Sequence, residues 1–588
     1  MRLDADISEV TSLSEKSPRT KAAQAPRISH PCLKQQDQTA IGLFRGSRYS
    51  IIHPVFVGSS RLPYFKCKRI GPLETMIPPY IEPNVLGLIE CSHSCIAHPP
   101  PQLPIYLLGH AVYNLFFHPL RRFPGPRLQH ISYHAYAYRL SRGTLAHDVA
   151  KWHRQYGPVV RISPDQLSFI EPDAWKDICG HRTGSKANVD EMPKWPGFYT
   201  VNGRPRTIIN ETKENHAVLR RSLAHGFSDR SMRLQEPIIG SYVDLLIRRL
   251  KERCHSEPAA DRPGGLTTRQ DIKTWYNWTT FDVIGDLAFG EPFDCLEKAE
   301  YHPWVDNMNK TTKSFGAFMA LKLVGFHWLV TAILKYGLSK TREDHMRRTM
   351  AKIERRASLT VERPDLIEGL LQLKGLGKEQ IRITAGTLII AGSETTATLL
   401  SGVTYLLLKN PEKLARLNEE VRSAFNDDNE ITLMSVANLP YMLACLDEAA
   451  RLYPPVAGGT PRVVPAGGAS IAGTYVPENT VVSVWQMAAY QNEQNFHEPF
   501  SFKPERFIER NSKVNTRDRF EVLQPFSVGP RNCIGRNLAY AEMRLILAKI
   551  LFNFDIELAD KEKDWIDHKS YVLWDKPALD IYLTPVRP

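Results

Sequence analysis

The stretch Phe526-Ser-Val-Gly529-Pro-Arg531-Asn-Cys533-Ile-Gly535 decides the fold class of this 588-residue chain. A cysteine thiolate that binds a metal needs backbone N–H donors close to its sulfur and no bulky neighbours. Gly529 and Gly535 permit that close approach. Arg531 supplies a positive charge nearby, and Phe526 is expected to pack against the loop and shield the sulfur. The stretch therefore predicts that Cys533 is a metal ligand.

The segment that follows this loop supports the same interpretation. Residues 538–551 are predicted to form a helix, and the positive end of its dipole is expected to lower the pKa of the Cys533 thiol. The alternative is a lone cysteine that is buried as a small apolar residue, which is the more common case. A chance match of five fixed positions is rare, so the ligand interpretation is favoured.

An apolar run near the middle of the chain carries a second signal. Residues 383–408 read ITAGTLIIAGSETTATLLSGVTYLLL, with Glu394 as the only charge. By length the run qualifies as a transmembrane helix. However, Glu394 and Thr395 place a carboxylate and a hydroxyl at its centre, and an ionisable group is costly to bury. The run therefore indicates function, whether it crosses lipid or a protein core.

Two further motifs occur upstream of the Cys533 loop. Glu448-Ala-Ala-Arg451 puts two charges on one face of a predicted helix, and Phe502-Lys-Pro504-Glu505-Arg506-Phe507 follows it. With F-x-x-G-x-R-x-C-x-G, this order resembles the cytochrome P450 signature. The resemblance covers about residues 113–588. It implies a mainly α fold with a small β region, in which haem lies between the long central helix and the Cys533 loop.

The resemblance assigns roles to both faces of the haem. Cys533 is implied to be the axial ligand of the iron of haem b (iron protoporphyrin IX). The 383–408 run is implied to cross the distal face, where Ala391 and Gly392 leave room for dioxygen and substrate. Glu394 and Thr395 match the acid–alcohol pair that delivers protons. A hydroxyl alone on a helix more often bonds the carbonyl four residues earlier.

The resemblance also implies how the haem is held. The cofactor-binding set consists of His216, Arg220, Arg462, Phe526, Gly529, Arg531 and Gly535. The family often has Trp where this chain has His216, which still offers a hydrogen-bond donor. Arg506 is expected to join Glu448 and Arg451 in a buried charge network.

Composition divides the chain into three parts. Residues 1–100 are rich in Ser, Pro, Lys and Arg, which predicts a low-order extension or a doubtful gene start. Residues 103–117, LPIYLLGHAVYNLFF, are short of the ~20 apolar residues that span a bilayer. They form either a weak membrane anchor or a buried first helix. Prolines then stiffen a hinge, so residues 101–126 are assigned to anchor and hinge and 127–588 to the catalytic domain.

Hydrophobic periodicity predicts several elements of the catalytic domain. A hairpin is expected from residues 159–162 and 166–170, and late strands at 470–476 and 481–484. Helices are expected over 241–251, 272–289, 411–425 and 441–452.

The implied function is a monooxygenase that uses O2 to oxidise an apolar small molecule. No flavin or nicotinamide domain fits beside the catalytic domain, so electrons are expected from NADPH through a separate NADPH-cytochrome P450 reductase. The net charge of +12 suits an acidic partner, and no nucleic-acid motif is present. YNLFFHPLRRFPGP and HAVLRRSLAHGFS resemble filamentous-fungal members near the isotrichodermin hydroxylase branch, which acts on terpenoid and polyketide secondary metabolites. Membrane association on the cytosolic face of the endoplasmic reticulum is expected.

Two alternatives stay open at this point. One is a haem-thiolate isomerase or dehydratase that needs no reductase, against which the intact Glu394–Thr395 pair counts. The other is a non-enzymatic haem-binding protein. The residues expected to contact the substrate are Trp195, Phe198, Tyr199, Val456, Ala457 and Trp574.

Overall fold

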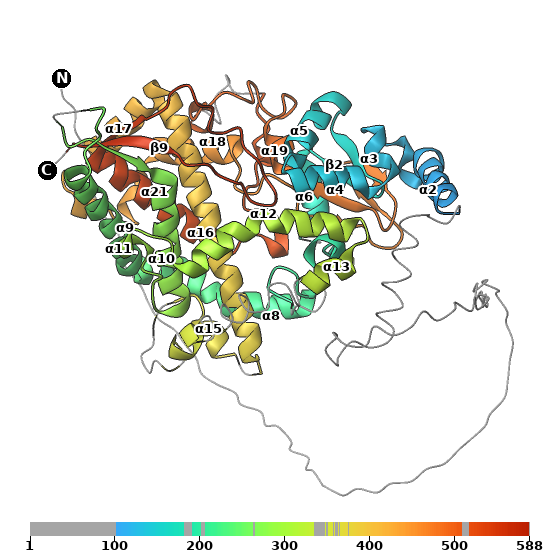
Figure 1. Cartoon of the computed structure of the whole chain (residues 1–588), viewed down its shortest axis with the longest axis horizontal. Coiled ribbons are helices and arrows are strands. Elements are labelled where there is room, and N and C mark those ends of the chain that lie inside the picture. Colours follow the sequence, from blue (N-terminus) through green and yellow to red (C-terminus); the bar gives the residue numbers. More distant parts are fainter. Residues whose placement is uncertain are drawn as a thin grey trace, which may run out of the picture. The chain divides into compact units, whose positions relative to one another are not determined.

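The computed structural model describes residues 102–181, 191–200, 206–262, 265–333, 347, 351–356, 358, 363, 365–373, 375–508 and 517–586. The extension expected over residues 1–100 lies outside the described residues. The family fold expected from the sequence, helical with a small β portion, is present (Figure 1).

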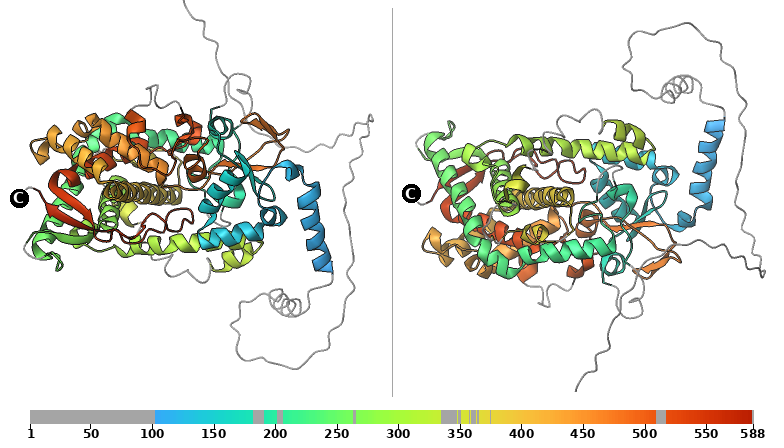
Figure 2. Two further views of the ribbon diagram at one scale, coloured as in Figure 1. Left: turned by 90° about the horizontal axis from the view of Figure 1, so that it is seen from above. Right: turned by 90° about the horizontal axis from the view of Figure 1, so that it is seen from below.

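The described part begins with an apolar helix whose side chains face outward. Helix α2 (Gln102–Val112) continues into a wider π-helical turn, η1 (Tyr113–Phe117), and then into the proline hinge. Ile105 is 71% exposed and Phe117 65% exposed. This exposure contradicts the alternative in which the segment is a buried first helix. Figure 2 shows α2 at the edge of the helical body.

A buried arginine ties the hinge to the domain. Arg161 in β1 (Val159–Ser163) donates to the Asn114 carbonyl at 3.0 Å and to the Pro164 carbonyl at 2.6 Å. Its own backbone N–H donates to the Pro124 carbonyl at 2.8 Å. Helix α2 therefore leaves the domain from a fixed point.

One long helix organises the domain. Helix α16 (Lys378–Lys409) runs through the centre, and Figure 2 shows it end-on with other helices around it. The helix is long and apolar enough to cross a membrane, but 56% of its most apolar 18-residue stretch is buried inside the protein. Helix α10 (Ile272–Phe289) packs along it. The sequence interpretation of 383–408 as a core helix is therefore confirmed, with five more residues at its start.

The other helices surround this centre. They are α3 (Arg127–Ile131), α4 (Tyr133–Arg142), α5 (Leu145–Tyr156), α6 (Pro172–Cys179), α7 (Pro196–Tyr199), α8 (Lys213–Ala224), α9 (Asp229–Ser256), α11 (Cys295–Lys298), α12 (Pro303–Leu323), α13 (His327–Ala332), α15 (Glu368–Leu371), α17 (Pro411–Ala424), α18 (Pro440–Leu452), α19 (Gln486–Tyr490), α20 (Glu505–Ile508) and α21 (Arg536–Asn553). Short 3-10 turns lie between them: η2 (Pro119–Arg122), η4 (His225–Phe227), η6 (Asp428–Glu430), η7 (Ser435–Asn438), η9 (Phe520–Val522) and η10 (Gly529–Arg531).

Proline marks several helix starts. Helices α6, α17 and α18 each have proline in their first turn, where its missing N–H costs no helical hydrogen bond. The predicted helices over 411–425 and 441–452 are confirmed. Their bounds agree with the structure within one residue at each end, because the proline fixes where each helix starts.

The small β portion forms three sheets. The first has the order β1-β2-β7-β4, with β2 (Gln166–Phe169), β7 (Val481–Val484) and β4 (Arg462–Val463). Its β1–β2 hairpin is antiparallel and β2–β7 is parallel. The second has the order β3-β9-β8 (Thr268–Asp271, Asp580–Pro585, Phe554–Leu558), and the third pairs β5 (Ala469–Ile471) with β6 (Thr474–Val476). The expected hairpin and the strand at 481–484 are thus confirmed, whereas the segment 470–476 is a pair of short antiparallel strands joined by a turn.

Candidate active site

The Cys533 loop is a compact turn that leads into α21. Its backbone closes through a hydrogen bond from the Cys533 N–H to the Phe526 carbonyl at 2.8 Å. The Phe526 ring lies 5.3 Å from the Tyr540 ring on α21, between centroids. Phe526 therefore attaches the start of the loop to the helix that follows it.

Gly529 is required where it stands. Its φ of 78° is in the left-handed region, and an added Cβ would lie 1.9 Å from the Cys179 carbonyl oxygen at the end of α6. Gly535 precedes α21, and an added Cβ there would lie 3.9 Å from the Cys533 sulfur. Gly529 thus permits the close approach of the loop to α6, whereas a Cβ at Gly535 would stand at ordinary van der Waals distance from the thiol.

Cys533 is accessible to solvent although protein surrounds it. Burial raises the pKa of its thiol, while the Gly535 N–H and the Arg220 guanidinium lower it. The net pKa of the free thiol is therefore raised, because the cost of burying a thiolate is larger than these two contributions. A metal cation at the sulfur supplies the missing stabilisation, since a coordinating thiol is deprotonated.

Basic side chains gather beside the loop, and they repel one another. They are Lys194, His216, Arg220, Arg462 and Arg531, with Glu191 as the acidic member of the group. Burial lowers the pKa of Lys194 to about 7, and the Arg462 and Arg531 charges lower it further. Burial and the Arg531 charge lower the pKa of His216 to about 4. The site therefore suits an additional anion.

Two of these cations already have partners. Arg531 binds the Glu191 carboxylate, with Nη2–Oε1 at 2.7 Å and Nε–Oε1 at 2.8 Å. Arg220 donates to the Asn532 carbonyl and, at 2.6 Å, to the Asn532 Oδ1. These contacts hold both arginines beside the Cys533 loop, and their role toward haem propionates stays a prediction.

Arg462 is the member best placed for a new anion, because Lys194 already donates to the Ile209 carbonyl and lies over the Tyr199 ring. Arg462 on β4 donates to the Met192 carbonyl at 3.2 Å, but its buried Nε has no hydrogen-bond partner in the described part of the chain. Lys194 lies in the segment that pairs with Arg462 across an isolated β-bridge. An orphaned guanidinium nitrogen and a surplus of cations beside an accessible thiol fit a haem with two carboxylates. The sequence interpretation missed Lys194 and Glu191, because a single charged loop residue has no distinctive sequence signal.

The distal helix has an accessible patch within an otherwise buried stretch. Ile390 is 44% exposed, and Ala391 is also exposed, while Glu394 and Thr395 one turn later are half-buried. The Thr395 hydroxyl donates to the Ala391 carbonyl at 2.6 Å, which is the ordinary bond of a helical hydroxyl. Its oxygen lone pairs remain available to accept a hydrogen bond from water.

Gly392 lies where α10 and α16 meet. An added Cβ would lie 2.9 Å from the Ile284 side chain on α10, so the glycine allows the two helices to pack closely. Its expected role in leaving room for dioxygen, together with Ala391, stays a prediction.

Residues 124–582 match the sequence profile of the cytochrome P450 family. The chain belongs to the cytochrome P450 family. Cytochrome P450 monooxygenase tpeC of Talaromyces stipitatus is 49% identical over 485 residues, which cover 82% of this chain and 93% of the relative. Averantin hydroxylase of Dothistroma septosporum is 44% identical over 491 residues, covering 82% and 90%. Cytochrome P450 monooxygenase prhB of Penicillium brasilianum is 42% identical over 487 residues, covering 82% and 96%. This P450 is a haem-thiolate monooxygenase.

The P450 charge network behind the loop is fully buried. Glu448 on α18 binds Arg451 through two hydrogen bonds, at 2.7 and 2.8 Å, and Arg506 at 3.1 Å. Arg506 also binds Asp518, which the sequence interpretation missed. Arg451 donates to the carbonyls of Tyr490 and Pro499, so one guanidinium joins α19 to the following loop. The network fixes the segment that leads to Cys533.

Two of the substrate candidates, Ala457 and Trp574, are buried in the core of the P450 domain, and the other four are half-buried. Trp574 is 4% exposed, stacks on Tyr453 at 4.7 Å and donates to the Pro454 carbonyl. Trp195 stacks on Tyr133 at 6.2 Å. Trp574 is therefore a core residue in this structure.

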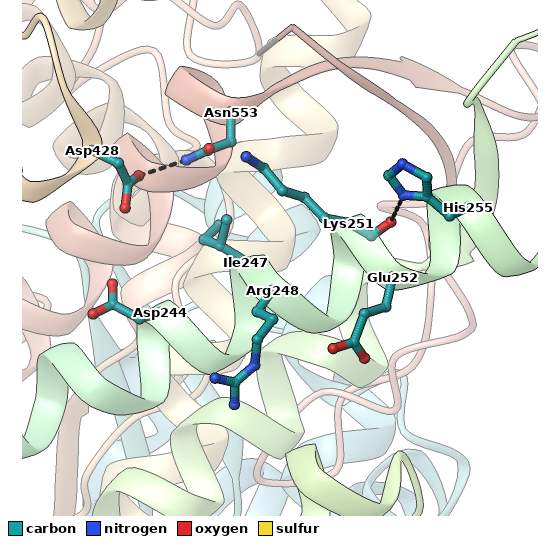
Figure 3. Close-up of a pocket in the computed structure, with 8 residues that line it drawn as sticks. All are labelled: Asp244, Ile247, Arg248, Lys251, Glu252, His255, Asp428 and Asn553. Atoms are coloured by element: carbon teal, nitrogen blue, oxygen red, sulfur yellow. Dashed lines mark hydrogen bonds between the residues drawn. The ribbon is translucent and has the colours of Figure 1, made fainter. Parts of the chain in front are cut away.

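A groove of about 560 Å³ lies elsewhere on the P450. Its lining comes from α9, η6 and the end of α21 (Figure 3): Asp244, Ile247, Arg248, Lys251, Glu252, His255, Asp428 and Asn553. Charges of both signs face it, and Lys549 already pairs with Asp244 and Asp428. None of these residues belongs to the site around Cys533.

Proposed function

We propose that this P450 hydroxylates or otherwise oxidises an apolar secondary-metabolite intermediate of the terpenoid or polyketide type, with electrons from NADPH through NADPH-cytochrome P450 reductase. The relatives support the substrate class, since one of them is an averantin hydroxylase. The overall change is R–H + O2 + 2 e− + 2 H+ → R–OH + H2O. The observation that carries the proposal is the Glu394–Thr395 pair at the accessible patch of α16.

Bound haem with its thiolate ligand supplies the activation of O2. In our proposal Cys533 holds the iron, and Lys194, His216, Arg220, Arg462 and Arg531 face the propionates. The anionic carboxylates relieve the mutual repulsion of these cations. Phe526, Gly529 and Gly535 shape the loop so that its sulfur meets the iron.

Thr395 and Glu394 deliver protons in this proposal. Because the Thr395 hydroxyl donates to Ala391, its oxygen is free to accept a hydrogen bond from a water and to hold that water over the haem. Glu394, which precedes Thr395 in α16, supplies the proton to that water. An isomerase has less need of such a pair, which favours the monooxygenase over that alternative.

The reductase is proposed to bind over the Cys533 loop. Arg220 joins α8 to Asn532, and Asn537 at the start of α21 donates to Asp229 at the start of α9, at 2.8 Å. Three helix ends thus meet around the loop. Their exposed cations include Arg221, Arg230, Arg233 and Arg536. A basic face around the ligand loop suits an acidic electron donor.

The exposed helix supports membrane association. Ile105, Tyr106, Leu108, Phe116 and Phe117 are each more than 60% exposed, an apolar surface that water does not favour. We propose that α2 and η1 lie in the cytosolic face of the endoplasmic reticulum membrane.

The assignment is tested first by spectroscopy. The reduced wild-type protein with carbon monoxide is expected to show the red-shifted Soret band of thiolate ligation. Cys533→Ser is expected to lose that band. A wild-type spectrum without the red shift would contradict Cys533 ligation.

The activity is tested with reductase, NADPH and extracts of a host strain that lacks the gene. Product that requires NADPH and O2 supports the proposal, and product formed without NADPH would favour the isomerase. Thr395→Ala is expected to keep the haem but divert NADPH electrons to hydrogen peroxide. Normal coupling in that variant would contradict the role of Thr395.

A further inference from the structure

Glu394 on α16 has a buried partner, Lys576, from near the C-terminus of the chain. Lys576 Nζ donates to Glu394 Oε1 and, at 2.7 Å, to the Thr398 hydroxyl. The Lys576 side chain is 2% exposed and that of Glu394 is 14% exposed. The pair therefore lies inside the protein, where a charge interaction is weakly screened.

The backbone around Lys576 is held on both sides. Trp574 Nε1 donates to the Pro454 carbonyl at 2.7 Å and its ring stacks on Tyr453. On the other side, Trp565 Nε1 donates to the Pro577 carbonyl at 3.2 Å. The Leu579 N–H donates to Asp271 Oδ1 at 2.8 Å. The ammonium group is thus presented to α16 from a fixed loop.

The two carboxylate oxygens of Glu394 have unequal surroundings. Oε1 is bound to Lys576, whereas Oε2 is buried and has no hydrogen-bond partner among the residues that the structure describes. Burial lowers the pKa of Lys576, while the Glu394 charge raises it. Lys273 and the hydroxyls of Tyr301 and Tyr453 are the other titratable groups in electrostatic contact with the pair.

We propose that Lys576 is a positioning residue for proton delivery in this P450. It binds Oε1 of Glu394 and holds this side chain as a carboxylate. The other oxygen, Oε2, then takes protons from water and passes them to the water held by Thr395. The proposal rests on the role proposed for Glu394. Each turnover consumes two protons with two electrons, and water leaves with one oxygen atom, so Glu394 must be reprotonated before the next transfer. The C-terminal loop thereby controls proton supply to the haem.

The test compares three lysine variants. Lys576→Met removes the ammonium and keeps the length of the side chain, and Lys576→Arg restores a cation. Lys549→Met is the matched control, because Lys549 is 5% exposed, binds two carboxylates and lies on α21. All three must first show the wild-type haem content and carbon monoxide spectrum, which identifies the folded fraction used for the other readouts.

The first readout is the infrared spectrum of the carboxyl groups, with or without bound haem. Lys576→Met leaves a buried carboxylate unpaired, which favours its neutral form. We expect an additional carboxylic acid band in this variant that is lost in Lys576→Met with Glu394→Gln. No such band is expected in Lys549→Met. Absence of the band from Lys576→Met would overturn the pairing whether or not the protein is a monooxygenase.

The second readout separates proton supply from haem chemistry. With reductase and no added substrate, NADPH consumption by Lys576→Met is expected to fall by about 10- to 100-fold, the range for removal of an outer partner. Oxidation of a peroxidase dye driven by hydrogen peroxide, which brings its own protons, should stay near the wild-type rate. Lys576→Arg should recover most of the loss. Equal slowing of both reactions, or no slowing, would overturn the proposal. Wild-type protein that consumes no NADPH would instead contradict the proposed function.

Discussion

At the scale of single residues, Glu448 is the acid that joins the buried charge network. It is fully buried and accepts hydrogen bonds from two guanidinium groups and the Lys503 N–H. Glu448→Ala leaves both cations buried without their acid, so we expect the free energy of unfolding to fall by about 3–5 kcal/mol. Urea unfolding of the haem-loaded protein measures this cost.

The control for Glu448 is an exposed pair of the same spacing. Glu252 binds Arg249 at 2.8 Å at the surface of α9, and Glu252→Ala is expected to cost less than about 1 kcal/mol. Similar costs for the two variants would contradict a structural role of the buried network.

Glu542 on α21 makes stability depend on pH. Burial raises the pKa of this carboxyl from 4.5 to about 8. The folded protein therefore holds a proton that the unfolded chain releases, and this contribution is complete below pH 4.5 and is lost as pH rises toward 8. Glu542→Gln keeps the neutral shape, so we expect its stability gain over wild type to grow across that window. Urea unfolding at both ends of the window measures it, with the exposed Glu412→Gln as control. A gain independent of pH would contradict the assignment.

At the scale of elements, the glycines of α16 differ in what surrounds them. An added Cβ at Gly402 would lie 2.4 Å from the Tyr453 ring, whereas at Gly386 nothing lies within 4 Å. Gly402→Ala is expected to destabilise by about 1–3 kcal/mol through overpacking. Gly386→Ala, on the same helix, is expected to stabilise by about 0.5–1 kcal/mol through helix propensity. Thermal unfolding measures both, and loss of stability in both variants would show that the contact with Tyr453 is not the cause.

Helices and strands of this protein followed from local pattern wherever the pattern was strong. The 272–289 and 481–484 segments were predicted with the bounds that the structure has. Helix α9 is longer than predicted, because it continues past Pro237 in its first turns. Gly392 shows the limit at this scale, since its contact with Ile284 depends on which face of α16 meets α10.

At the scale of the whole molecule, the exposed helix predicts how the protein meets lipid. Leu108 is 67% exposed and Phe116 is 63% exposed. Each apolar side chain of this size contributes about 1.5–3 kcal/mol when buried, so glutamate at both positions should weaken vesicle binding at least about tenfold. Leu234→Glu with Phe500→Glu is the control, because these side chains are 54% and 58% exposed outside α2. Sedimentation with phosphatidylcholine vesicles measures binding, and an equal loss in both pairs would contradict a specific role for α2.

The sequence by itself determined the family, the order of the motifs and the long central helix, and it predicts Cys533 as the iron ligand. These features are local: a cysteine between glycines, an acid and an alcohol on one turn, an apolar run of helical length. Only the tertiary structure decided that α2 is exposed, that Arg531 binds Glu191, and that Lys576 binds Glu394 across 182 residues of sequence. The physical reason is that burial and charge pairing depend on which distant segments meet. The local sequence pattern does not specify which distant segments come into contact.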